Sequence, residues 1–321
     1  LGFFSSCLTG TEVLPEYVLD RQVFGDVRDF DPMLLEGFDY VVHLAAISND
    51  PISNQFERAT YDINHVATID IAEKARAAGL KGFVFASSCS MYGFAASGAR
   101  TERDELNPLT PYAKSKVKAE EDLRGVARED FRVTALRFCT ACGFSPRTRL
   151  DLVLNDFVAC AVSGQDITVL SDGTPWRPLI DVSDMSRAIE WALLHGDEER
   201  ENGFLAVNVG ADDSNTQVKD FAHAVAGEIP GTGVSINSDA PPDKRSYRVD
   251  FGLYRRLAPD HQPRFGLRSS IVGLRDGLRG MGFTDGEFRS HTLMRIHHLN
   301  RLRERGLLDE DFRWIRATQM A

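Results

Sequence analysis

Short apolar runs alternate with helical patterns along most of the chain, and this alternation constrains the fold more than any other feature of the sequence. The runs at 39–44 (DYVVHL) and 82–86 (GFVFA) are almost continuously apolar, which is typical of strands buried on both faces of a sheet. A helical pattern at 59–78 separates them and stops at Gly79. Because such repeats indicate parallel βαβ units, we expect an α/β protein with a doubly wound parallel sheet.

The same alternation continues beyond the second run. We predict further strands at 22–24, 132–137, 167–170 and 205–209. Helices are predicted at 110–126, at 152–163, from a cap at Ser183 to 194, at 218–227 and, as a charged tail, at 285–305. After Gly231, short strands and scattered arginines indicate a smaller C-terminal lobe interleaved with the main one.

Composition excludes several classes of protein. The 321 residues carry a net charge of −10, which argues against a protein that binds the nucleic-acid backbone. No apolar run approaches the roughly 18 residues of a membrane span. Five scattered cysteines are an odd number, so we expect reduced thiols and a cytoplasmic protein. The lone pair Cys139-x-x-Cys142 is interpreted as core packing, and we expect no metal site.

The strongest chemical motif is Tyr112-Ala113-Lys114-Ser115-Lys116, a Y-x-x-x-K at the start of a helix with Thr110 as its cap. A spacing of four places Tyr112 and Lys116 on one helix face. A cation beside a phenol favours the phenolate and lowers its pKa, so Tyr112 is a candidate general base. The pattern alone is weak, because many helices hold Tyr and Lys four residues apart.

Two further groups of residues follow predicted strands. Ser87 and Ser88 come directly after the strand at 82–86, and functional groups gather at the carboxyl ends of parallel strands. The stretch His43-Leu44-Ala45-Ala46 ends the strand at 39–44 with small residues that let a flat ligand approach the backbone. We interpret His43 as a core residue and predict that Ser88 donates a hydrogen bond to a substrate oxygen near Tyr112.

The chain carries three motifs in a fixed order along the sequence, namely H-L-A-A, S-S and Y-x-x-x-K. In this respect it resembles the extended short-chain dehydrogenase/reductase family, in its nucleotide-sugar epimerase/dehydratase branch. The resemblance covers nearly the whole chain and implies a Rossmann-like NAD(P)-binding domain at 1–170. It implies that residues 171–321 form mostly a substrate-binding lobe, with 205–227 returning to the first domain. It also implies a homodimer built from the helices at 59–78 and 110–126.

The resemblance assigns roles residue by residue. Tyr112 would be the catalytic base, Ser88 its hydrogen-bonding partner at the substrate, and Lys116 would hold the nicotinamide ribose. The remaining cofactor contacts of NAD, or of NADP as the alternative, would come from Asp26, Val27, Leu44, Ala45, Ala46, Ser48 and Asn64. Substrate diphosphate would be bound by Asn155 and Arg177, because arginine suits bidentate phosphate contacts.

Three departures from the family pattern affect these expectations. The sequence has no G-x-x-G-x-x-G, whose backbone binds pyrophosphate, so we expect a chain that begins after the second family strand and binds NAD(P) poorly or not at all. We then expect the segment up to about Asp29 to be displaced, poorly ordered or re-paired against the open edge of 39–44. Cys89 and Ser90 stand where dehydratases of the family carry Asp-Glu. The usual R-x-G-D is replaced by APPD at 240–243, so Arg245 or Arg248 is expected to supply its arginine.

The function predicted on this resemblance is NAD(P)-dependent redox chemistry on a nucleotide-linked sugar, namely C4 epimerisation through transient oxidation with Tyr112 as base. The alternatives are an NADPH-dependent ketoreductase, a dehydratase, and, from another class, a non-catalytic protein that keeps the dinucleotide-binding fold. Steady consumption of reduced cofactor would distinguish the ketoreductase from the epimerase.

Overall fold

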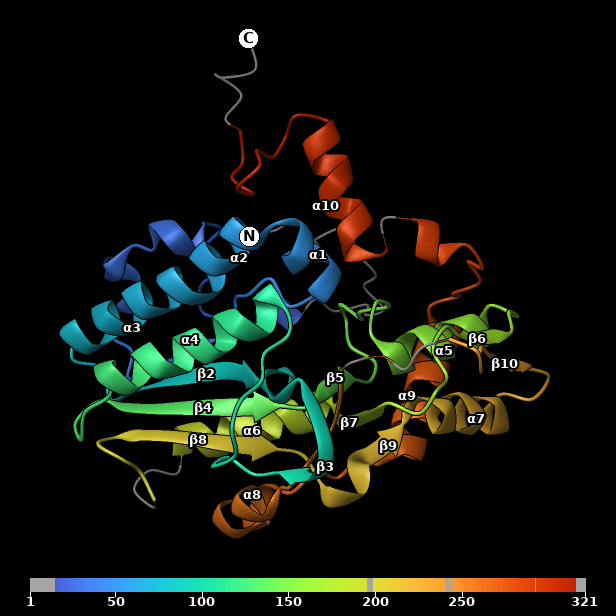
Figure 1. Ribbon diagram of the computed structural model, residues 1–321. Helices are drawn as coiled ribbons and strands as arrows, with labels where there is room; N and C mark the ends of the chain where they lie inside the picture. The colour runs from blue at the N-terminus through green and yellow to red at the C-terminus, as the bar shows by residue number, and fades with distance from the viewer. Residues whose placement is uncertain (1–14, 195–198, 241–242, 244, 292, 316–321) are drawn as a thin grey trace.

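A parallel four-stranded sheet with the strand order β1-β2-β4-β8 lies at the centre of the computed structural model (Figure 1), which describes residues 15–194, 199–240, 243, 245–291 and 293–315. Its strands are β1 (Tyr40–His43), β2 (Gly82–Ser88), β4 (Arg132–Phe138) and β8 (Phe204–Val209). Apolar residues that are buried on both faces of β2 and β4 form the middle of this sheet, as the continuous apolar runs predict.

Helices cover both faces of the sheet, which confirms the doubly wound architecture. One face is covered by α2 (Glu57–Tyr61), a π-helical turn (Asp62–Val66), α3 (Ala67–Ala77) and α4 (Pro111–Val126). The other face is covered by α6 (Val182–Leu194) and α8 (Gly252–Leu257). Gly79 has a φ of 79° and ends the first helical segment as expected. Helix α6 begins at Val182 rather than after Ser183, because the Asp181 carboxylate accepts from the backbone N–H of Ser183.

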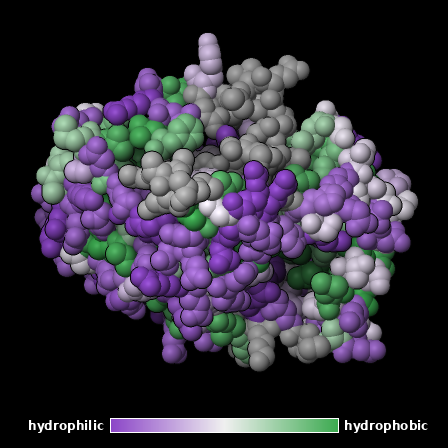
Figure 2. Space-filling model, turned by 90° about the horizontal axis from the view of Figure 1, so that it is seen from above, coloured by the Kyte–Doolittle hydropathy of each residue, from purple (hydrophilic) through white to green (hydrophobic). Residues whose placement is uncertain are grey.

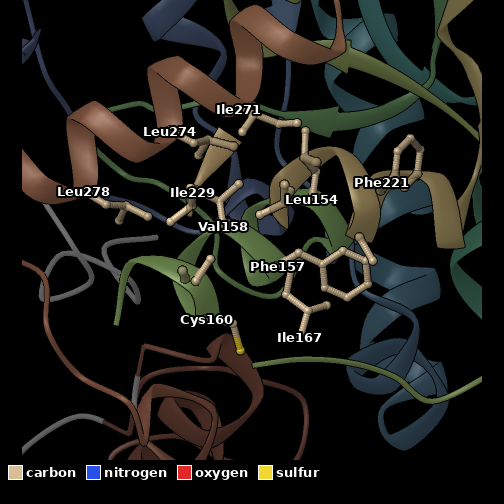
Figure 3. Packing of buried hydrophobic residues seen from close by; sticks show 14 of the residues in the cluster. Leu154, Phe157, Val158, Cys160, Ile167, Phe221, Ile229, Ile271, Leu274 and Leu278 are labelled. Atoms are coloured by element: carbon tan, nitrogen blue, oxygen red, sulfur yellow. The ribbon is translucent and has the colours of Figure 1, made fainter. Parts of the chain in front are cut away.

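A second core lies beside the sheet (Figure 3). Its helices are α5 (Val153–Val162), α7 (Val218–Glu228) and α9 (Leu267–Gly280), and they pack against the strand pair β6 (Ile167–Val169) and β10 (Val234–Ile236). Figure 3 shows Leu274 and Leu278 of α9 facing Ile229 and Val158. The parallel pair of β3 (Phe94–Arg100) with β11 (Ser246–Val249) and the sheet of β5 (Thr140–Cys142), β7 (Trp176–Asp181) and β9 (Asn215–Gln217) lie between the two cores. The predicted domain boundary at residue 170 stays a prediction.

The segment before β1 differs from the prediction. Residues 22–24 form no strand: Val23 and Phe24 are exposed, and within the described part of the chain β1 pairs on one side only, with β2. A short polar-flanked run such as this one cannot form a strand without a neighbouring strand to accept its hydrogen bonds. Residues 1–14 of the segment expected to be displaced lie outside the described residues.

Residues 295–315, called the C-terminal arm here, pack against α1 and the segment before β1. Helix α10 (Arg295–Glu304), shorter than the predicted 285–305, lies next to α1 (Asp50–Gln55) in Figure 1, and its Leu299 packs into a cluster with Ile52 and Phe56. The ring of Phe312 lies against the ring of Phe56 in a tilted arrangement, with ring centroids 4.4 Å apart. Arg28 donates to the backbone oxygen of Asp311 at 2.6 Å, so the arm is tied to the segment before β1.

The surface seen in Figure 2 is mostly hydrophilic, with hydrophobic residues in small separate groups. None of the helices within the described ranges is both long enough and apolar enough to cross a membrane.

Candidate active site

Ser88, Tyr112 and Lys116 meet at the carboxyl edge of the central sheet. Ser88 is the last residue of β2, and Tyr112 and Lys116 lie in the first two turns of α4, which crosses above that strand. The hydroxyl of Thr110 accepts from the backbone N–H of Ala113 at 3.2 Å, so Thr110 caps the helix as predicted. This cap and Pro111 fix where α4 begins, and therefore where Tyr112 lies relative to the end of β2.

Lys116 is buried beneath the site. Its ammonium donates to the backbone oxygen of Ala86 at 2.7 Å and lies 4.5 Å from the ring centroid of Phe85 and 5.9 Å from that of Tyr112. An ammonium has three N–H donors. Within the described residues, the ammonium of Lys116 donates a single hydrogen bond, the one to Ala86. Burial lowers the pKa of Lys116 to about 7. The side chain can therefore donate to further oxygens that enter the site.

The pKa of Tyr112 differs from the expectation. Burial raises the pKa of Tyr112 above its ordinary value, and the interaction with Ser88 and the charge of Arg149 act in the opposite direction. We expected Lys116 to lower this pKa, but the burial of Lys116 disfavours its own positive charge. The phenol of Tyr112 is therefore protonated at neutral pH until a ligand changes its surroundings.

These residues open into one large cavity of about 920 Å³ between the sheet and the second core. A cavity of this size accommodates a ligand larger than a simple sugar. The predicted site residues that line it are Leu44, Ala46, Ser48, Ser88, Tyr112, Lys116, Arg177 and Arg245. The structure thus brings together residues that lie up to two hundred positions apart in the sequence.

The two arginines are held by carboxylates. Arg177 donates to Asp243 at 3.0 Å, and Arg245 binds the same carboxylate through two nitrogens at 2.7 and 3.0 Å. Arg245 also reaches across the cavity to Asp50 at 2.5 Å, and Asp50 accepts from the hydroxyl of Thr110. A continuous chain of charged groups therefore joins the C-terminal lobe to the start of α4.

Six predicted residues lie outside the cavity wall: Asp26, Val27, Ala45, Asn64, Asn155 and Arg248. The Asp26 carboxylate is occupied by Arg28, with which it forms an ion pair at 2.5 Å. The side-chain amide of Asn155 forms hydrogen bonds with backbone groups of Gly143 and Arg149. The guanidinium carbon of Arg248 lies 5.3 Å from the ring centroid of Trp176.

Asn64 has a positioning role in the structure. Its side chain accepts from the backbone N–H of Ile47 at 2.7 Å and donates to the backbone oxygen of the same residue at 2.9 Å. It also donates to the hydroxyl of Ser115, on α4, at 3.1 Å. Asn64 therefore holds the loop after β1 against the helix that carries Tyr112 and Lys116.

Sequence reasoning missed several charged residues of the cavity. Arg149 binds Asp151 through two hydrogen bonds of 3.0 and 2.8 Å and donates to the hydroxyl of Ser48 at 3.0 Å. Asp156 and Arg289 form an ion pair in the same wall, where Arg289 comes from the C-terminal region. The R-x-D spacing at 149–151 was a usable signal, but Arg289 had none because its partner lies 133 residues away.

A buried ion pair supports the sheet beneath the site. Arg137 and Glu120 are bound at 2.7 Å, and Glu120 also accepts from the hydroxyl of Ser87. Arg137 in turn donates to the hydroxyl of Tyr92 at 3.0 Å. This network joins α4 to the ends of β2 and β4, so it fixes the distance between Ser88 and Tyr112.

A parallel sheet with Ser88 at its carboxyl edge and a Y-x-x-x-K helix above it agrees with the resemblance to the extended short-chain dehydrogenase/reductases. Residues 12–210 match the model of the NAD dependent epimerase/dehydratase family, and the chain belongs to this family.

Sequence relatives in this family are nucleotide-sugar epimerases. UDP-arabinose 4-epimerase 1 of Arabidopsis thaliana is 28% identical over 239 residues, which are 68% of this chain and 55% of that protein. A UDP-glucose epimerase of Bacillus subtilis described as uncharacterised is 30% identical over 220 residues, which are 64% of this chain and 68% of that protein. The chain thus spans little more than half of the plant relative.

Solved structures resemble the chain over a larger share of its length. MoeE5, in complex with UDP-glucose and NAD, has a TM-score of 0.69 and 28% identity, and the match covers 81% of this chain and 85% of that one. The UDP-glucuronic acid 4-epimerase of Bacillus cereus has a TM-score of 0.67 at 22% identity, covering 79% and 80%, which shows the shared fold.

Proposed function

We propose that this protein epimerises a nucleotide-diphosphate sugar at C4, with NAD as cofactor and Tyr112 as the residue that takes and returns the proton. The observation that carries the proposal is the shared cavity: Ser88, Tyr112 and Lys116 line the same cavity as Arg177 and Arg245. The first three residues suit chemistry at a sugar hydroxyl, and two arginines suit a diphosphate. The epimerases and the UDP-glucose complex among the relatives support this substrate class.

The residues present fit one end of NAD. The free donors of Lys116, the phenol of Tyr112 and the small side chains after β1 suit a nicotinamide ribose. The pyrophosphate end has no matching glycine-rich loop in the 321 residues, and Asp26 is already bound by Arg28. We therefore expect this chain to need millimolar NAD, and we assign no residue to the adenine end.

Within the site, each side chain has a distinct task. When bound, NAD supplies a reversible acceptor for the hydride that leaves the sugar carbon. Ser88 holds the sugar hydroxyl by a hydrogen bond, and Tyr112, as its phenolate, accepts the proton of that hydroxyl as the carbonyl forms. The positive charges of Lys116 and of the bound cofactor would favour this phenolate over the neutral phenol. After the keto sugar has turned over in the cavity, its carbonyl carbon would take the hydride back on the opposite face, and Tyr112 returns the proton to the carbonyl oxygen. The 920 Å³ cavity provides the space for this turn.

The environment of Cys89 disfavours the dehydratase alternative. Elimination of water needs an acid and a base close to the keto sugar. Cys89 is fully buried and its thiol donates to the backbone oxygen of Arg137, while Ser90 is bonded to Ser88. Neither residue replaces the Asp-Glu pair that the family's dehydratases use at these positions.

The test is the interconversion of UDP-glucose and UDP-galactose with millimolar NAD. We expect Tyr112→Phe to lower the rate by roughly 10²- to 10⁴-fold, because a positioned general base is lost while the ring still fills its space. Binding of UDP-glucose, measured by calorimetry, should stay within twofold of the unmodified protein.

Two further results discriminate the alternatives. Lys116→Ala should weaken NAD binding and lower the rate together, because the ammonium serves both. Steady oxidation of NADPH without formation of the epimer would show that the protein is a ketoreductase and not an epimerase. Unchanged turnover in Tyr112→Phe would contradict the assignment of the base.

We also propose a homodimer in which α3 and α4 of two subunits form the interface. The two helices pack side by side in each subunit, and the π-helical turn before α3 is joined to α4 by the hydrogen bond between His65 and Asp122 at 2.7 Å. Tyr61 and Val66 expose nearly half of their surface next to this pair.

A further inference from the structure

Asp50 differs from the other carboxylates of the cavity in how it is held. Four carboxylates among the described residues line the cavity, and they belong to Asp50, Asp151, Asp156 and Asp243. Each of the last three is bound by an arginine side chain through two hydrogen bonds. Within the described residues, Asp50 accepts a single hydrogen bond from an arginine, the one from Nη1 of Arg245 at 2.5 Å, and its side chain is 21% exposed. Asp50 is therefore the carboxylate of this cavity that an arriving ligand frees most easily.

The position of Asp50 is beside the proposed catalytic tyrosine. Asp50 lies in the first turn of α1, and its Oδ1 accepts from the hydroxyl of Thr110 at 2.8 Å. Thr110 caps α4 two positions before Tyr112. After burial, which is the main cause, the charge of Asp50 also raises the pKa of Tyr112, so the carboxylate and the phenol are close enough to interact. A carbonyl that forms where Tyr112 removes a hydroxyl proton would thus have Asp50 as a neighbour.

Binding of a diphosphate at Arg245 would free this carboxylate. Arg245 is anchored by Asp243 through its Nε and Nη2, at 3.0 and 2.7 Å, whereas its Nη1 binds Asp50. A diphosphate oxygen that accepts from Nη1 leaves Arg245 in place and removes the partner of the Asp50 Oδ2. The Oδ1 stays oriented by Thr110, so the freed Oδ2 remains in the cavity next to Tyr112.

We propose that Asp50 is a second general base of the site, which removes a proton from a carbon next to the C4 carbonyl of a nucleotide-linked 4-keto sugar. The proposal rests on the proposed function, because that carbonyl is the intermediate of C4 epimerisation. A carbonyl acidifies the hydrogens of both neighbouring carbons, C3 and C5, and a positioned carboxylate can accept one of them.

The step balances without any further reactant. The proton passes from the carbon to Oδ2 of Asp50, and the electron pair of the C–H bond moves into an enolate. The enolate oxygen accepts hydrogen bonds from Ser88 and from Tyr112, which has become a neutral phenol by taking the hydroxyl proton. Because Asp50 is partly exposed, its proton exchanges with water before it returns to the carbon. The ketone is then restored with a solvent hydrogen, and return to the opposite face would invert that carbon.

The experiment supplies the 4-keto sugar directly, so that it requires no hydride transfer. The full chain is incubated in heavy water with a saturating concentration of UDP-4-keto-6-deoxyglucose, and deuterium uptake at C3 and C5 is followed by mass spectrometry and proton NMR. We expect the unmodified protein to accelerate the exchange at one of these carbons over the protein-free solution. Asp50→Asn should lower the exchange rate by roughly 10²-fold or more, toward the protein-free rate, because an amide does not accept the proton.

Asp70→Asn is the matched control, since it makes the same change of charge on α3, outside the cavity. It should exchange as fast as the unmodified protein, and calorimetric binding of UDP checks that the Asp50→Asn site is folded. An unmodified protein that does not accelerate the exchange, or an Asp50→Asn variant that exchanges at the same rate, would overturn the role of Asp50. Neither result bears on the interconversion of UDP-glucose and UDP-galactose, which tests the proposed function separately.

Discussion

His43 shows how burial controls the charge of a single residue in this protein. It ends β1, lies 5% exposed between Phe83 and Phe85, and shares a hydrogen bond of 3.0 Å with Thr68. Burial, followed by the charge of Lys116, lowers the pKa of His43 to about 3. The residue is therefore a neutral part of the core, which agrees with its interpretation as a structural histidine.

This burial predicts a loss of stability in acid. The unfolded chain takes up a proton at His43 below pH 6.5, whereas the folded chain does so only near pH 3. The contribution of His43 to the free energy of unfolding is thus present above pH 6.5 and falls by up to about 1.4 kcal/mol per pH unit as the pH decreases toward 3. Urea unfolding at pH 7 and pH 5 should show a smaller loss in His43→Gln than in the unmodified protein.

The control for this prediction is His297→Gln, which changes an exposed histidine of α10. This variant should lose as much stability between the two pH values as the unmodified protein. A His43→Gln variant with the same acid dependence as the control would show that His43 is not the group responsible.

At the scale of elements, the start of α1 is joined to both the start of α4 and the C-terminal lobe. Asp50, in the first turn of α1, accepts from Thr110 at 2.8 Å and binds Arg245 at 2.5 Å. In this arrangement, the carboxylates of Asp50 and Asp243 neutralise the two arginines that face the cavity. An anionic ligand must compete with these carboxylates for Arg177 and Arg245.

We therefore predict that Asp50→Asn tightens UDP binding. The asparagine oxygen can still accept from Thr110, but the negative charge opposite Arg245 is removed. Affinity for UDP, measured by calorimetry at low salt, should rise roughly threefold to tenfold, and the gain should shrink at high salt. Asp70→Asn, which changes a carboxylate of α3 outside the cavity, should leave the affinity unchanged. Weaker UDP binding in Asp50→Asn would instead assign Asp50 a direct role in holding the ligand.

At the scale of the whole molecule, the C-terminal arm and the helix pair α3–α4 occupy different sides of the N-terminal region. The arm covers α1 and α2 through Leu299 and Phe312, so that surface is filled from within the chain. The face of α3 and α4 carries no such cover in the described residues, and Tyr61 and Val66 remain exposed there. This difference is why the proposed subunit interface lies on α3 and α4.

Light scattering should therefore give a mass of twice 35.7 kDa at micromolar concentration. Val66→Asp should shift the protein toward the monomer, because a charge would be buried in an apolar interface. Leu194→Asp, which changes an exposed leucine at the end of α6, should leave the mass unchanged. A monomer in the unmodified protein would contradict the proposed dimer.

Local patterns in the sequence determined the α/β class, the strands β1, β2, β4, β6 and β8, the helices α3 to α7, and the places of Ser88, Tyr112 and Lys116 on these elements. Apolar runs and helix caps are short-range signals, so β2, β4 and α4 form where the sequence predicts them. Ser88, Tyr112 and Lys116 could be found because each is tied to the end of a strand or the start of a helix. The strand predicted at 22–24 was wrong because its hydrogen bonds depend on a neighbouring strand rather than on its own residues.

Tertiary structure alone decided the contacts between distant segments. Asp50 and Arg245 are 195 residues apart, and Arg28 binds a backbone oxygen 283 residues away. The spacing of apolar residues along the sequence cannot predict such pairs, because the two partners come together only when the sheet and the second core pack. The sequence also could not show that the Tyr247 hydroxyl has no hydrogen-bond partner among the described residues, because that depends on which groups the packed fold brings near it. Local hydrogen bonding and apolar spacing are encoded in neighbouring residues, whereas charge pairing and cavity lining depend on the packed fold.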